Sequence, residues 1–210
     1  MSTRCRWFAY FLLFMVVAFC VTWGVVWYGS FPNLPEFRVD SVSVSNFSYF
    51  DSNASVTGNW NVRFSVYNPN KKFSISYDVA QSSLLYDPKT SHLFHAPEFT
   101  SETRIPGFNQ FARNRTFIDA AFASRDDYVD RGALRDINVD GTPGSIAFNV
   151  ILATGFKFMA TGSGQVVDIG SDYITVWCEG LVVSLSPSPS YSSASGSGKL
   201  VKPRDCEVSS

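Results

Sequence analysis

The chain has 210 residues, of which 45% are hydrophobic and 16% aromatic, and its formal net charge is −1. This length suits one folded domain with a short appendage, and the aromatic content argues against a disordered, self-repelling chain. Because 17 Lys and Arg residues are balanced by 18 Asp and Glu residues, the composition also argues against a nucleic-acid-binding protein.

The first predicted element is a membrane span. After a tail of residues 1–6, residues 7–28 contain no charged side chain. A helix of that length would measure about 33 Å, enough to cross a hydrocarbon core of about 30 Å. A cleaved signal peptide is the alternative, but its apolar region is usually shorter and ends in small residues. Here the run ends in Trp27 and Tyr28, so we expect an uncleaved transmembrane signal anchor.

Charges beside the span predict its orientation. Arg4 and Arg6 precede it, whereas the next positive residue is Arg38. The positive-inside rule therefore leaves residues 1–6 in the cytosol and places the remainder of the chain outside it. Cys5 then lies beside the inner leaflet as a candidate for S-acylation, with an unmodified thiol as the alternative.

Cysteines and glycosylation sequons agree with this orientation. Of the four cysteines, one lies in the tail and one in the span, which leaves Cys178 and Cys206 in an oxidising compartment. We expect these two to form a disulfide, with two free thiols as the alternative. Three N-x-S/T sequons begin at Asn46, Asn53 and Asn114, and each is a candidate glycosylation site.

Beyond the span, residues 29–38 contain two prolines and predict a short stalk, and residues 39–210 form the ectodomain. Apolar residues there recur mostly with period two, which is typical of half-buried β-strands. The pattern covers residues 41–45, 61–67, 72–79, 146–152, 174–178 and 181–185. It predicts a mainly β fold, an immunoglobulin- or fibronectin-like β-sandwich of about seven or eight strands.

Two ectodomain segments depart from this alternation. Ser124 followed by Asp127 resembles a helix start, because Ser124 can act as N-cap and the acid suits the positive helix end. We therefore expect one short helix between Ser124 and Gly141. Residues 186–198 are rich in Ser, Gly and Pro and predict a flexible connecting loop.

Catalytic and metal-binding motifs were not found. The chain has no nucleophile elbow, phosphate-binding loop or dinucleotide fingerprint. His92 and His95 lack a third ligand nearby, and Asp126, Asp127 and Asp130 lack the spacing of a calcium loop. We expect neither enzymatic activity nor a metal or cofactor.

Asn68-Pro69-Asn70 predicts a turn between two strands. Asn68 is pushed towards an extended conformation by the proline, Pro69 suits the second turn position, and Asn70 tolerates a left-handed third position. This segment and the Tyr77-Asp78 pair that follows resemble the plant harpin-induced-like family. That family is related to the non-race-specific disease resistance proteins and carries a late-embryogenesis-abundant type 2 domain. Further similar segments are residues 105–110, 114–116, 178–183 and 206–208.

The resemblance implies a single-pass protein of the plasma membrane, with residence in the endoplasmic reticulum or plasmodesmata as alternatives. It implies a non-enzymatic adaptor in plant defence, hypersensitive or stress responses, binding a cell-wall component or a membrane protein. A stress-protective or lipid-binding domain with an apolar groove is the rival hypothesis. The Asn68-Pro69-Asn70 turn is either a recognition site or only a well-formed turn, and the oligomeric state is left open.

Overall fold

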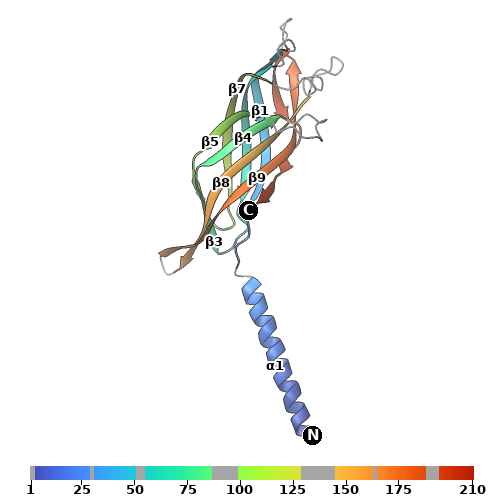
Figure 1. The fold of residues 1–210 in the computed structure, drawn as a ribbon, viewed down its shortest axis with the longest axis vertical. Helices are drawn as coiled ribbons and strands as arrows, with labels where there is room; N and C mark the ends of the chain where they lie inside the picture. The colour runs from blue at the N-terminus through green and yellow to red at the C-terminus, as the bar shows by residue number, and fades with distance from the viewer. Residues whose placement is uncertain are drawn as a thin grey trace. The chain divides into compact units, whose positions relative to one another are not determined.

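A computed structural model describes residues 3–28, 31–50, 55–86, 99–128, 145–162, 165–187 and 194–210. The chain divides into two compact units, Met1–Asn33 and Leu34–Ser210. We call them the helix unit and the β unit (Figure 1).

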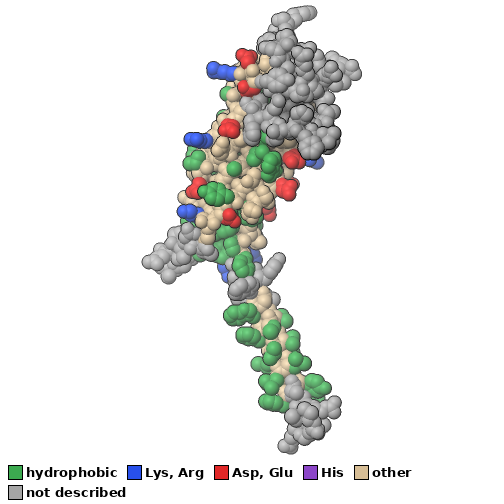
Figure 2. Space-filling view, viewed as in Figure 1, with side chains coloured by type: hydrophobic (Ala, Val, Ile, Leu, Met, Phe, Trp, Pro, Cys, Tyr) green, Lys and Arg blue, Asp and Glu red, His purple; other side chains and the backbone are tan. Residues whose placement is uncertain are grey.

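The helix unit contains α1 (Thr3–Tyr28), 26 residues long. Its described side chains are uncharged and mostly hydrophobic, as Figure 2 shows. The expectation of a helix over residues 7–28 is confirmed. Among the described residues, no helix has both the length and the apolar sequence that a membrane crossing requires. The side chain of Cys5 lies outside the described part of the chain.

In its described residues, the β unit contains twelve strands. They are β1 (Glu36–Phe50), β2 (Ser55–Tyr67), β3 (Phe73–Tyr77), β4 (Ala80–Tyr86), β5 (Phe99–Ile105), β6 (Phe108–Gln110), β7 (Arg115–Tyr128), β8 (Ser145–Gly162), β9 (Gln165–Pro187), β10 (Ala194–Leu200), β11 (Arg204–Asp205) and β12 (Glu207–Ser209).

All twelve strands belong to one hydrogen-bonded sheet, whose main path runs β5-β4-β8-β9-β10-β1-β2-β7. Its two end strands, β5 and β7, contact each other, and the Ser101 hydroxyl donates to the Ala123 carbonyl across that junction at 3.2 Å. The sheet therefore curls until its two end strands meet. The expected mainly β class is confirmed, with an architecture of the β-sandwich or barrel-like kind.

Alternating apolar residues fill the interior as the sequence predicts. Val62, Phe64 and Val66 of β2 have no exposed area, because successive strand residues point to opposite faces. Across the interior, the rings of Trp60 on β2 and Phe148 on β8 lie 5.1 Å apart. Further large side chains with under 2% exposure are Phe47, Phe156, Ile75, Ile146, Leu152, Ile174 and Leu181.

The predicted helix start at Ser124 is wrong, because β7 continues to Tyr128. Ser124 is buried, and its hydroxyl has no hydrogen-bond partner in the described part of the chain. Asp127, which resembled a helix-start signal, instead pairs with Val56 of β2 next to a β-bulge that contains Asp126. Asp126 has a positive φ of 51°, and its N–H donates to the Thr57 hydroxyl at 3.0 Å. The remainder of the expected helix lies outside the described residues.

The Ser- and Gly-rich segment is not only a connecting loop. Its first residues end β9 and its last begin β10, which pairs with β9 and β1; residues 188–193 are not described. A small residue is required at Gly198 of β10, because a Cβ there would lie 2.5 Å from Cγ1 of Val183. At this position, a residue that suggested a loop reflects close packing.

Two smaller expectations also need correction. The stalk is shorter than predicted, because β1 begins at Glu36, where Pro35 and Phe37 are already buried. The alternation over residues 72–79 predicts that Val79 faces the interior, but Val79 is 61% exposed, since β3 ends at Tyr77 and β4 begins only at Ala80.

Candidate functional site

The Asn68-Pro69-Asn70 segment, here called the asparagine turn, joins two loops of the β unit. The Asn68 side-chain amide donates to the Phe73 carbonyl at 2.8 Å and to the Phe111 carbonyl at 3.1 Å. Its oxygen accepts from the Asn70 backbone N–H at 3.0 Å and from the Asn70 amide at 2.9 Å. One side chain thus fastens the β2–β3 loop to the β6–β7 loop.

Burial favours a structural role for this turn. Asn68 has no exposed area and Asn70 only 4%, so neither side chain is presented to a partner. Asn70 also lacks the left-handed conformation that the sequence suggested. Arg113 in the opposite loop has it instead, with φ of 58°, and its N–H donates to the Asn70 carbonyl at 3.0 Å.

A second buried network lies beside the turn. Gln110 has no exposed area, and its amide donates to the carbonyls of Val66 at 2.8 Å and Asn114 at 3.1 Å. Its oxygen accepts from the Tyr77 hydroxyl at 3.1 Å. Burial raises the pKa of Tyr77 far above its usual value, so this phenol remains a donor. Full pairing of buried polar groups indicates a rigid scaffold.

Two glycines lie against the Tyr77-Asp78 pair. A Cβ at Gly107 would lie 2.6 Å from the Tyr77 carbonyl oxygen, and a Cβ at Gly155 would lie 2.6 Å from Oδ2 of Asp78. Tyr77-Asp78 is therefore packed between two positions that cannot carry a side chain without a shift. Tyr77, the last residue of β3, pairs with Phe108 of β6 and Phe156 of β8.

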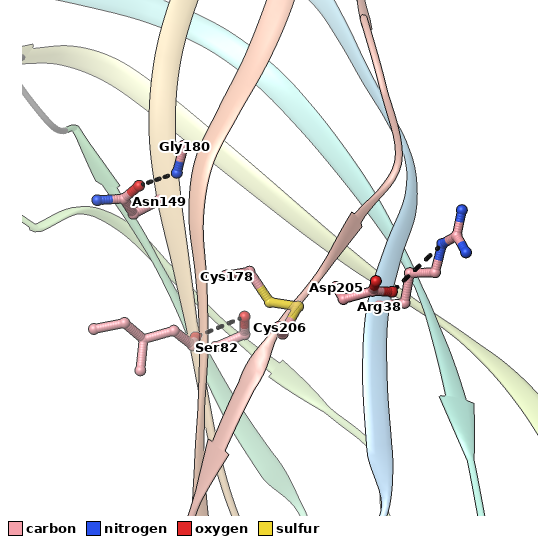
Figure 3. Close-up of a disulfide and its surroundings, with 8 residues drawn as sticks. Arg38, Ser82, Asn149, Cys178, Gly180, Asp205 and Cys206 are labelled. Carbon is pink, nitrogen blue, oxygen red and sulfur yellow. Dashed lines mark hydrogen bonds and ion pairs between the residues drawn. A yellow bond between two sulfur atoms is a disulfide. The ribbon is translucent and has the colours of Figure 1, made fainter.

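Cys178 and Cys206 form a disulfide, as predicted, with their Cα atoms 4.4 Å apart. Figure 3 shows that it joins β9 to the chain between β11 and β12. Next to it, the Gly180 N–H donates to the Asn149 side-chain oxygen at 2.7 Å. Gly180 has φ of 63° and lies at a register shift between β8 and β9, as expected for a bulge. The C-terminal segment is thereby fixed to the sheet.

An open cleft of about 480 Å³ lies beside this fixed segment. Three stretches line it: the start of β1, the end of β2 with the start of β7, and the C-terminal segment. Its lining residues are Pro35, Glu36, Phe37, Arg38, Ser65, Tyr67, Arg115, Asp205, Cys206 and Val208. We call it the arginine cleft.

The two arginines of the cleft have different surroundings. Nε of Arg38 lies 3.3 Å from an Asp40 carboxylate oxygen and 3.9 Å from one of Asp205, the latter pair drawn in Figure 3. Arg115 instead donates to the Ser65 hydroxyl at 3.2 Å, and its Cζ lies 5.6 Å from the Tyr67 ring centroid. No described carboxylate lies within ion-pair distance of Arg115.

An arginine oriented by a hydroxyl and an aromatic ring, with no counter-ion among the described side chains, is suited to bind an anion. The planar guanidinium presents several donors that match a carboxylate or phosphate. Sequence reasoning did not identify this cleft, because its walls come from distant parts of the chain. The only sequence signal is that Tyr67 borders one segment of the family resemblance and Arg115 lies within another.

Comparisons with known proteins do not assign the site. No protein-family model and no curated protein matches the chain. The resemblance to harpin-induced-like proteins therefore stays a prediction, and the site has to be interpreted from its own chemistry.

The remaining predicted site residues are spread over the β unit. Asn46 is exposed with φ of 53° at a bulge in β1, whereas Asn114 is exposed beside the asparagine turn. Asn53, His92 and His95 lie outside the described residues. In the part of the chain that is described, no three His, Cys, Asp or Glu side chains lie together as a metal site would require.

Proposed function

We propose that this chain is a non-enzymatic, single-pass membrane protein whose β unit binds an acidic partner through the arginine cleft. The observation that carries this proposal is Arg115, which is held by Ser65 and Tyr67 without a carboxylate partner among the described residues. A carboxylate of a membrane protein or of an acidic cell-wall component would complete it.

The anchor is part of the same proposal. It rests on the uncharged sequence of residues 7–28 and on a helix of 26 residues, about 39 Å at 1.5 Å per residue. Arg4 and Arg6 favour a cytosolic N-terminus. Three sequons beyond residue 28 support an exoplasmic β unit.

The setting comes from the sequence resemblance. We propose an immunoglobulin- or fibronectin-like ectodomain at the plant plasma membrane that acts as an adaptor in defence, hypersensitive or stress responses. The endoplasmic reticulum and plasmodesmata are alternative locations. The rival lipid-binding function needs an apolar interior groove, and the large side chains inside the described β unit favour the adaptor instead.

Proximity labelling of the full chain in intact tissue tests the proposal. Arg115→Ala should lose most of the partners that the wild-type protein labels, because the partner's carboxylate is left unpaired. Arg63→Ala is the matched control: Arg63 is also an exposed arginine of the β2–β7 pair, but it is bound to Asp119 at 2.8 Å, away from the cleft. Equal labelling by the wild-type and both variant proteins would refute the cleft as the binding site.

A further inference from the structure

Two short loops lie side by side at one end of the β unit. The β2–β3 loop contains Lys71 and Lys72, and the β6–β7 loop contains Phe111 and Arg113. The hydrogen bonds from Asn68 to the Phe111 carbonyl and from Arg113 to the Asn70 carbonyl join them. We call Lys71, Lys72, Arg113 and Phe111 the basic tip.

Charge is segregated at this tip. The chain after residue 28 has 17 − 2 = 15 Lys and Arg residues against 18 Asp and Glu residues, yet residues 69–72 and 111–114 contain three cations and no acid. All three cations are exposed, and none lies within ion-pair distance of a described carboxylate. Figure 2 shows Lys and Arg side chains at the end of the β unit where Figure 1 labels β3. Glu36 lies opposite Tyr67 at the same strand end.

The tip presents an aromatic ring together with these cations. Phe111 is 74% exposed, although its own carbonyl is held by the buried Asn68. Arg113 keeps a positive φ that ordinarily favours Gly or Asn. The asparagine turn thus holds apolar and basic side chains outward on a rigid base.

The tip also lies at the end where the β unit begins. Glu36, the first residue of β1, is paired with Tyr67, and Tyr67 is paired with Arg115, so the start of β1 and both loops share one strand end. Seven residues, 29–35, connect α1 to β1. Such a connector spans at most about 25–30 Å.

We propose that the basic tip binds lipid phosphate groups on the surface of the membrane that α1 anchors. Lys and Arg side chains recognise phosphate, and aromatic rings favour the water–lipid interface. Because α1 would tether the β unit to the membrane, the tip would meet lipid headgroups at a high effective concentration. A small site of three cations and one aromatic ring is then enough for binding. A free acidic polymer would gain no such increase in effective concentration, so this small site favours the membrane surface as its partner. The inference rests on the proposed anchor.

Photo-crosslinking of the full chain in nanodiscs of mixed phosphatidylcholine and phosphatidylglycerol tests this proposal. A headgroup diazirine lipid should label residues 69–72 and 111–114, and an acyl-chain diazirine lipid should label α1. Lys71→Glu, Lys72→Glu and Arg113→Glu together should lower headgroup labelling by about tenfold or more. The control variant combines Arg104→Glu, Lys199→Glu and Lys202→Glu. These three residues are exposed cations outside the basic tip, and their substitution changes the total charge by the same amount. The headgroup lipid should label the control variant as strongly as it labels the wild-type chain. Equal unfolding transitions of both triple variants show that folding is retained.

The outcomes separate the two proposals. Labelled α1 with unlabelled loops overturns tip docking and leaves the anchor standing, whereas unlabelled α1 overturns the anchor. Acetylation of Lys71 and Lys72 distinguishes the two ligands. If polygalacturonic acid protects these lysines from acetylation and lipid does not, the tip is an acidic polysaccharide site and lipid docking is refuted. A glycan on most copies of Asn114 would also refute it by covering the tip. Glycosylation at Asn46 is compatible, because Asn46 lies ten residues along β1 from Glu36.

Discussion

Asn68 makes four side-chain hydrogen bonds without any exposed surface. Asn68→Ala would leave the Phe73 and Phe111 carbonyls and two Asn70 donors without these partners. Each buried group left unpaired costs about 1–3 kcal/mol, with part recovered by relaxation. We expect the free energy of unfolding to fall by about 3 kcal/mol, measured by denaturant titration of the full chain in detergent.

Asn61→Ala is the matched control, because Asn61 is an exposed asparagine of the same strand, β2. Its removal should change the free energy of unfolding by less than about 0.5 kcal/mol. Equal effects of the two substitutions would show that the asparagine turn is not the fastening between its loops.

The buried phenol of Tyr77 should make the β unit less stable at alkaline pH. Burial raises the pKa of the folded phenol well above its unfolded value, which is about 10. Above that pH the unfolded chain loses this proton and the folded chain keeps it, so the unfolded state binds fewer protons. The free energy of unfolding then falls by about 1.4 kcal/mol per pH unit for this group.

A difference between two proteins isolates that contribution. The stability advantage of the wild-type chain over Tyr77→Phe should be constant up to about pH 9.5 and shrink above about pH 10. Tyr173→Phe is the control, because Tyr173 is 78% exposed and its substitution should leave the slope unchanged. A constant wild-type advantage through pH 11 would contradict the assigned burial effect.

At the scale of elements, the disulfide fixes the short C-terminal strand β12 to β9. The bond closes a loop with a sequence separation of 28 residues, worth roughly 3–4 kcal/mol in the loop-entropy model. Cys178→Ala with Cys206→Ala should lower the free energy of unfolding by about that amount. It should also speed amide exchange at Glu207–Ser209, which pair with β9, whereas Cys20→Ser should do neither. Unchanged exchange in β12 would mean that strand pairing alone holds this segment.

Strand prediction succeeded where one face of a strand is buried by sequence-distant neighbours. Val62, Phe64 and Val66 alternate with polar residues and are buried as expected. It failed at Ser124, where a bulge and a helix start use the same residue types, and at Gly198, where close packing imitates a loop composition. The alternation of apolar and polar residues indicates which face of a strand is buried. It does not indicate how closely the backbones of two strands approach each other.

The candidate site was predicted less well than the fold. Asn68 was recognised as part of a turn, but its contact with Phe111 spans 43 residues of sequence and could not be deduced locally. The arginine cleft combines the start of β1, the start of β7 and the C-terminal segment. Only the three-dimensional pairing of those segments shows that Arg115 has no carboxylate partner among the described residues.

At the scale of the whole molecule, the features of interest share one end of the β unit. The first residue of β1, the asparagine turn and the arginine cleft all border the Glu36, Tyr67 and Arg115 row. The sequon at Asn46 lies far along β1. The proposed binding functions at one end and the predicted glycan at a distance from it would be compatible in one exoplasmic domain.

Topology decides whether this arrangement can operate at a membrane. In microsomes, the full chain should gain an endoglycosidase-sensitive glycan at Asn46, since that exposed sequon follows the proposed anchor. Asn46→Gln should remove one glycoform. Arg4→Glu and Arg6→Glu combined with Ser30→Arg and Asn33→Arg reverse the flanking charges, so glycosylation should fall sharply as the orientation inverts. A wild-type chain that stays unglycosylated and exposed to protease on the cytosolic face of sealed microsomes would contradict the exoplasmic assignment of the β unit.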